Sequence, residues 1–183
     1  MTADSLSYHF DGVVARLRAH RAADVGETAD AAVATVLRPG PAGAEVLYIK
    51  RAEREGDPWS GHVAFPGGMR APVDATLFDT ARRETVEEVG LDLDAASFIV
   101  CLGEVSAIRN RVRAVQFVFA MGFTPPLTLS REVAATLWVP LEHAAALDAS
   151  RPAVELPSLQ FGSYLVWGMT YRMTRRLLEA VRG

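Results

Sequence analysis

The 183-residue chain has little cysteine, little lysine and no long apolar segment. Its one cysteine, Cys101, excludes an internal disulfide and a metal cluster built on cysteine. The formal net charge of -3 gives no reason to expect nucleic acid or an anionic membrane as a partner. No apolar run reaches the roughly 18 residues that span a bilayer, and the first residues do not form a basic segment followed by an apolar one. We therefore expect a cytoplasmic protein that binds neither nucleic acid nor membranes.

Half of the 183 residues are hydrophobic, which is enough for one domain with a substantial core. We expect a single domain over residues 1–183, with residues 1–25 as an N-terminal helical extension. Runs rich in β-branched and aromatic residues predict strands at 31–39, 44–51, 62–65, 97–108, 111–121 and 132–141, the first two forming a hairpin. Helical spacing predicts helices at 10–17, at about 76–89 and through 163–183. This irregular alternation predicts an α/β fold with a mixed β-sheet between helices.

The central predicted helix concentrates carboxylates. Glu84 and Glu88 lie beside its apolar stripe, and Glu87 lies one position further round. Such clusters are usually solvated acidic faces. Here, however, Glu84 and Glu88 are a like-charged i, i+4 pair near the core and toward the C-terminal end, where the helix dipole also disfavours negative charge. A divalent cation such as Mg²⁺ or Mn²⁺ would remove these objections, and such cations usually work with substrate phosphates.

Neighbouring residues extend the metal hypothesis. Arg83 precedes Glu84 by one residue and Glu87 by four, so it can pair with a carboxylate and orient it. Upstream, Gly67 and Gly68 are predicted to form a tight bend that lets backbone approach a ligand closely. Alone, a Gly-Gly turn is more often structural. In front of this helix it indicates a carbonyl ligand and a backbone that faces phosphate.

The stretch RETVEEVGL, residues 83–91, resembles the second half of the Nudix box, with Thr85 where an apolar residue is usual. The first half departs from the pattern, since a one-residue insertion is needed to bring Asp74 to the acidic position, and its role stays open. With HVAFPGG ahead and VWGMT (166–170) opening the last helix, this form resembles the coenzyme A diphosphatase branch. The upstream signature is only partly met, because Arg51-Ala52 replaces Arg-Ser and one extra residue precedes FPGG.

The resemblance implies a Nudix α/β/α sandwich that hydrolyses the diphosphate bond of a nucleoside diphosphate derivative. The branch implies coenzyme A or acyl-coenzyme A as substrate, giving 3′,5′-ADP and (acyl) phosphopantetheine. Two alternatives stay open: a diphosphatase for ADP-ribose or a nucleotide sugar, and a non-catalytic Nudix module that binds a nucleotide. The family also makes a homodimer reasonable.

By the same resemblance, the metal ligands are Glu84, Glu87, Glu88 and the carbonyl of Gly68, holding Mg²⁺ or Mn²⁺. The catalytic residues are Glu87, Glu84, Arg83 and Glu132. The general base is either a box glutamate or a later one, Glu132 or Glu104, each of which is also read as an ordinary surface residue.

For the substrate, we expect Gly67, Gly68, Arg51, Arg54 and Arg70 to contact phosphate, although each arginine alone is more often simply exposed. Trp59 either stacks on adenine or covers the small core of its own loop, and the second is favoured. His62 is read as a hydrogen-bonded turn residue.

Overall fold

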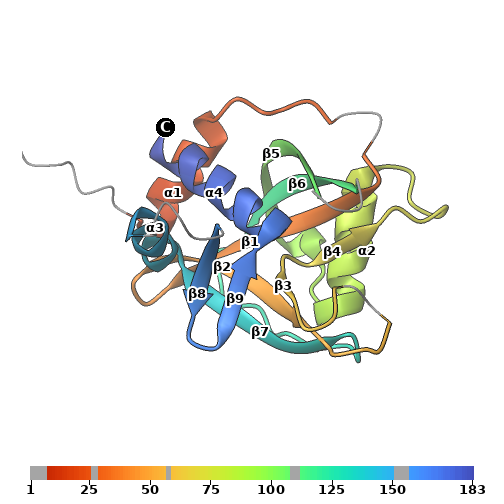
Figure 1. The fold of residues 1–183 in the computed structure, drawn as a ribbon. Helices are drawn as coiled ribbons and strands as arrows, with labels where there is room; N and C mark the ends of the chain where they lie inside the picture. Colours follow the sequence, from red (N-terminus) through yellow and green to blue (C-terminus); the bar gives the residue numbers. More distant parts are fainter. Residues whose placement is uncertain (1–7, 26–28, 57–58, 108–111, 151–156) are drawn as a thin grey trace, which may run out of the picture.

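The computed structural model describes residues 8–25, 29–56, 59–107, 112–150 and 157–183 (Figure 1). Residues 1–7 of the predicted extension, and residues 108 and 111 at two predicted strand ends, lie outside these ranges. The elements in chain order are α1 (Phe10–Ala19), β1 (Ala31–Gly40), β2 (Gly43–Arg51), β3 (Val63–Ala64), β4 (Gly67–Met69), α2 (Leu77–Val89), η1 (Leu93–Ala95), β5 (Ser97–Ser106), β6 (Arg113–Ala120), β7 (Val133–Pro140), α3 (Leu141–Ser150), β8 (Ser158–Phe161), β9 (Tyr164–Trp167) and α4 (Gly168–Arg182).

Within the described residues, seven strands form one mixed sheet in the order β3-β2-β1-β6-β5, with β4 also paired to β1 and β7 to β2. Strand β1 is the central strand of this order. The start of β1 pairs antiparallel with β4, Ala32 opposite Gly68, and its end pairs antiparallel with β2, Leu37 opposite Val46. Its other edge runs parallel to β6. Strands β4 and β2 thus follow one another along the same edge of β1, and this junction is called the fork below.

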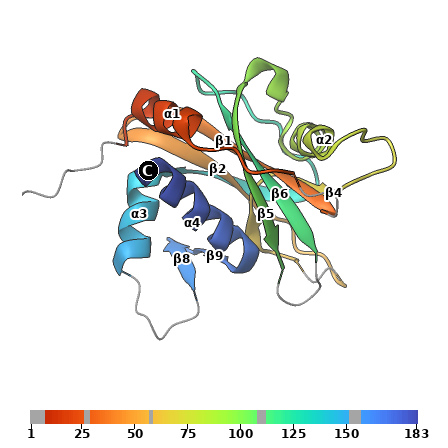
Figure 2. The same cartoon turned by 90° about the horizontal axis from the view of Figure 1, so that it is seen from above.

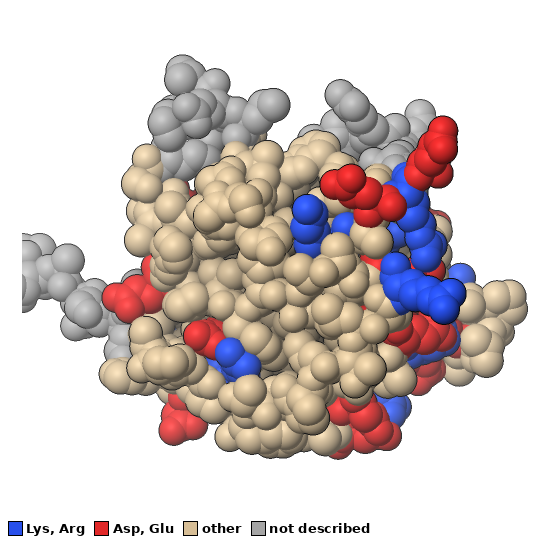
Figure 3. All heavy atoms as spheres, turned by 90° about the horizontal axis from the view of Figure 1, so that it is seen from below, with Lys and Arg blue, Asp and Glu red and all other residues tan. Residues whose placement is uncertain are grey.

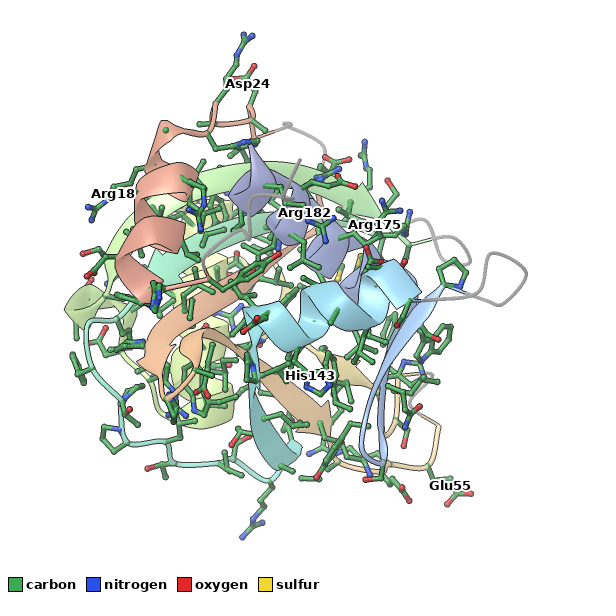
Figure 4. The ribbon with its side chains drawn as sticks, turned by 90° about the vertical axis from the view of Figure 1, so that its left-hand side faces the viewer. Arg18, Asp24, Glu55, His143, Arg175 and Arg182 are labelled. Carbon is green, nitrogen blue, oxygen red and sulfur yellow. The ribbon has the colours of Figure 1, made fainter. Side chains whose placement is uncertain are left out.

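Helices cover both faces of the sheet (Figure 2). Because side chains alternate along a strand, Ala32 and Ala34 of β1 pack with α2, whereas Ala31 and Val33 pack with the cluster that contains α1, α3 and α4. Figure 4 looks onto this second layer, where Arg175 of α4 lies 3.6 Å from Asp148 of α3. The predicted α/β/α sandwich is confirmed. In the described part of the chain, no helix is long and apolar enough to cross a bilayer.

Helix α2 begins and ends where the sequence indicates. Thr76 accepts a hydrogen bond from the Asp79 N–H, and the Asp79 carboxylate accepts one from the Thr76 N–H, a reciprocal capping box. Gly90 ends the helix in the left-handed conformation, with φ 66°, and its N–H reaches the Val86 carbonyl. These two caps fix the length and position of the segment that carries the glutamates.

Three local details differ from the predictions or add to them. Residues 164–167 form β9, paired antiparallel with β8, so the last helix starts only at Gly168. Helix α3 follows β7 directly and was not predicted. The bend predicted at PGG lies at Pro66, and Gly67–Met69 continues as the short strand β4, paired with β1.

Candidate active site

Helix α2 packs against β4, which brings its acidic side to the two glycines. Glu88 is 4% exposed, and its Oε2 accepts a hydrogen bond of 2.9 Å from the Gly67 N–H. The Glu84 carboxylate lies over Gly68, where an added Cβ would come within 2.6 Å of its Oε1. Gly68 is therefore needed for this approach. Glu87 points outward, with a side chain 58% exposed.

Arg83 joins the glutamates to the loop before the helix. Its Nη1 lies 2.8 Å from Glu84 Oε1 and 3.0 Å from Glu87 Oε2. Its Nε and Nη2 donate to the two oxygens of Asp74, each at 2.9 Å. Asp74 is buried and also accepts from the Ala71 N–H and the Thr80 hydroxyl. Asp74 thus fixes the guanidinium that holds Glu84 and Glu87.

Asp74 differs from Glu84 and Glu88 in its electrostatic environment. Burial raises the pKa of Glu88 to about 7, a rise opposed by the Gly67 N–H and reinforced by the charge of Glu84. Burial likewise raises the pKa of Glu84, although Arg83 opposes it. The hydrogen bonds from Arg83 hold the pKa of Asp74 well below its usual range. The fold therefore stabilises the charge of Asp74 but leaves that of Glu84 and Glu88 poorly compensated.

The sequence that carries these glutamates, the arginine and the glycines matches a known domain. The NUDIX domain model matches residues 28–158. The chain belongs to the Nudix hydrolase family. Two relatives described as uncharacterized Nudix hydrolase NudL, from Yersinia enterocolitica and Cronobacter sakazakii, are 31% identical over 158 residues and 34% identical over 159. These matches cover 80% and 79% of this chain, and 77% and 78% of the relatives.

Other similarities are shorter or show the fold alone. The uncharacterized protein C14C4.10c of Schizosaccharomyces pombe is 41% identical over 104 residues, 52% of this chain but only 32% of that protein, so the chain spans about a third of it. The Nudix hydrolase RenU of M. smegmatis aligns with TM-score 0.57 and 22% identity, covering 84% of this chain and 86% of that one. A MutT/nudix protein of Enterococcus faecalis gives TM-score 0.60 at 17% identity, covering 88% and 65%.

The departure of the Nudix box at Thr85 has a local explanation. Thr85 is fully buried on the sheet side of α2. Its hydroxyl donates a 2.7 Å hydrogen bond to the Ala81 carbonyl one turn earlier. The polar atom is thereby satisfied inside the helix, and the residue occupies the place of an apolar side chain.

The Nudix helix, α2, carries the oxygen ligands that a hard divalent cation prefers. Among the described residues, no three His, Cys, Asp or Glu side chains stand ready to hold a metal. The contacts above give the reason, because Arg83 draws Glu84 and Glu87 while Glu88 turns to Gly67. The donors nevertheless fit Mg²⁺ or Mn²⁺, because Glu84 and Glu88 are negative charges that the protein alone compensates poorly.

Three residues predicted for catalysis or substrate lie together beside Glu88. Arg51 Nη1 is 3.9 Å from Glu88 Oε1. Arg54 Nη1 is 3.0 Å from Glu132 Oε1, and both side chains are about half exposed. The charge of Glu132 also contributes to the raised pKa of Glu88. In Figure 3, acidic and basic side chains gather along the right-hand edge of the face shown, the side where α2 lies in Figure 1.

Two other predicted residues lie elsewhere. Arg70 donates to the carbonyl oxygens of Asp74 and Ala75, the latter at 2.6 Å, so its guanidinium holds the loop before the Nudix helix. Its contact with phosphate stays a prediction. Glu104 lies on β5, at the opposite end of the sheet from β3, and pairs with Arg113 at 3.6 Å.

Sequence reasoning missed two features of this region. The role of Asp74 was open, although the shifted box placed it at the acidic position, which was the one available signal. Trp167 received no role. Its ring lies 4.9 Å from the ring of His62, so the end of β9 meets the start of β3 beside Arg51.

Proposed function

We propose that this Nudix chain hydrolyses the diphosphate bond of a nucleoside diphosphate derivative, with Mg²⁺ or Mn²⁺ held by Glu84, Glu87, Glu88 and the Gly68 carbonyl. One observation carries the proposal: Glu88 is buried against Gly67, with its pKa raised to about 7 and the Glu84 charge nearby. An acidic pair in this position weakens the fold unless it binds a cation.

The residues of the chain supply orientation and charge. The bound cation would neutralise phosphate oxygens and lower the pKa of the attacking water. Asp74 keeps Arg83 in place, and Arg83 orients Glu84 and Glu87. We propose Glu87 or Glu132, whose side chains are both more than half exposed, as the general base that accepts a proton from water.

For the substrate, we propose coenzyme A or acyl-coenzyme A, cleaved to 3′,5′-ADP and (acyl) phosphopantetheine. The shifted box and the VWGMT segment support this choice, and Arg51 and Arg54 beside Glu88 give cations for substrate phosphate. ADP-ribose or a nucleotide sugar is the second candidate. A non-catalytic nucleotide-binding module is the third, which the presence of Glu84, Glu87 and Glu88 disfavours.

The first experiment is hydrolysis by the purified chain with Mg²⁺ or Mn²⁺ across coenzyme A, 3′-dephospho-coenzyme A, ADP-ribose, NADH and UDP-glucose. We expect coenzyme A to be cleaved fastest, and the 3′-dephospho form much more slowly. Preference for ADP-ribose or UDP-glucose would overturn the substrate but keep the chemistry. No cleavage of any compound would overturn hydrolysis.

Glu87→Gln separates hydrolysis from binding. We expect kcat to fall by about 100-fold or more while nucleotide binding persists. Glu179→Gln is the matched control, since Glu179 is 59% exposed and pairs with Arg175 at i, i+4 as Glu87 pairs with Arg83. Equal activity in both variants would exclude a catalytic role for Glu87.

A further inference from the structure

We infer that Trp167 and His62 form a subsite for the aromatic base of the nucleotide. This rests on the proposed function, because the ligand is the nucleoside half of that substrate. His62 lies just before β3 and Trp167 ends β9, and Figure 1 shows these strands side by side. Their rings meet edge to face, with centroids 4.9 Å apart and an interplanar angle of 71°.

The ring pair lies one arginine away from the buried glutamate. The backbone N–H of Arg51 donates to the His62 carbonyl at 2.9 Å, while the Arg51 guanidinium reaches within 3.9 Å of Glu88. Arg51 therefore connects the ring pair to the proposed diphosphate site, through its backbone at one end and its guanidinium at the other. Any nucleobase can stack on such rings, so stacking provides affinity without hydrogen bonds specific to one base.

Trp167 keeps much of its ring in water. It is 44% exposed, and Leu165 on the same strand and Trp59 in the loop before β3 are 44% and 42% exposed. Trp59 is joined to the pair, because its carbonyl accepts from the His62 N–H at 3.1 Å. Single exposed apolar residues are common. Trp167, in ring contact with His62 and exposed near the Arg51 backbone, offers a face on which a nucleobase can stack.

The position of Trp167 gives a second, independent reason. It is the N-cap residue of α4, and no side-chain hydrogen bond caps this helix. Ser, Thr, Asp or Asn at an N-cap would stabilise the helix by bonding one of its free N–H groups. A tryptophan here gives up that stabilisation. Local rules are broken at functional or strained sites, and the exposure of Trp167 beside His62 points to a functional one.

The test is binding of ADP and of pyrophosphate to the whole chain with Mg²⁺, measured by calorimetry. Trp167→Leu should weaken ADP about tenfold and leave pyrophosphate unchanged, since only ADP carries a base. Trp167→Phe should restore most of the loss. ADP should also quench indole fluorescence in the wild type, and this quenching should disappear in Trp167→Leu, although Trp59 and Trp138 remain.

Phe98→Leu is the matched control. Phe98 is 47% exposed and lies in edge-to-face contact with Phe78, but on β5, at the other end of the sheet. This control should bind ADP like the wild type.

Equal ADP affinity in Trp167→Leu and wild type would overturn the subsite. A change only in self-association would also overturn it, because Trp167 would then be a contact between copies. If the wild type hydrolyses no substrate but Trp167→Leu still weakens ADP binding, the subsite is supported and only the proposed hydrolysis is rejected.

Discussion

At the scale of the residue, three neighbouring glutamates have three environments. The side chains of Glu84, Glu87 and Glu88 are 18%, 58% and 5% exposed. The helical wheel predicted this order, because it placed Glu84 and Glu88 beside the buried stripe. The partner of Arg83 was not predictable in the same way. Asp74 reaches Arg83 only because the loop turns back on itself through the Ala71 N–H, and spacing along a sequence does not encode that turn.

Asp74→Asn tests this anchor. Replacing a buried partner of Arg83 should lower the free energy of unfolding by about 2 kcal/mol and kcat by about tenfold. Denaturant titration and steady-state kinetics measure the two effects. Asp94→Asn is the control, because Asp94 pairs with Arg82 on the same helix but is 69% exposed. Its effect should be under about 0.5 kcal/mol. If both variants behave alike, Asp74 does not position Arg83.

At the scale of the element, α2 was predictable because its ends carry local signals. A capping threonine and a left-handed glycine define the helix without help from the rest of the fold. Residues 164–167 lack such signals. Their apolar spacing continues into α4, and they become a strand only because β8 lies opposite. Pairing between distant segments decides the structure there, and one sequence does not show it.

Thr76→Ala tests the N-terminal cap of the Nudix helix. The variant loses the hydrogen bond from the Asp79 N–H, which should lower the free energy of unfolding by about 1 kcal/mol in a urea titration. Thr76→Ser should keep it. The kcat should not change, because Glu84 lies two turns further along. A loss of kcat in a folded Thr76→Ala chain would show that the cap also sets the geometry of the glutamates.

At the scale of the whole molecule, we expect the acidic site to couple the free energy of unfolding to pH and to the proposed metal. The pKa of Glu88 in the fold, about 7, lies above its ordinary value of 4.5. The folded state binds the Glu88 proton more tightly than the unfolded state does. Protonation of Glu88 therefore contributes fully to the free energy of unfolding below about pH 4.5, and this contribution is lost as the pH rises through about 7. Without metal, Glu88→Gln should therefore be more stable than wild type at pH 8, by about 2 kcal/mol, and should not be at pH 4.

Metal should reverse this loss. A cation binds the ionised glutamates, so Mn²⁺ should raise the melting temperature of the wild type at pH 8 and much less at pH 5. Scanning calorimetry with and without Mn²⁺ measures the difference. In Glu88→Gln the Mn²⁺-dependent rise should be much smaller. An equal rise at both pH values would mean that Mn²⁺ binds somewhere other than Glu88.

Under the proposed function, the fork in the sheet lies between the metal-binding glutamates and the loop that carries the proposed substrate arginines. The Ala34 N–H bonds to the Pro66 carbonyl and the Arg51 N–H to the His62 carbonyl, so both ends of the connection between β2 and β4 are held by backbone. We expect an insertion in that connection to enlarge the loop and to leave Gly68 beside Glu84. The extra residue ahead of FPGG is such a change. Related proteins can therefore keep the same reaction while their substrates diverge. Membership of a family then predicts which type of bond is broken better than it predicts the substrate.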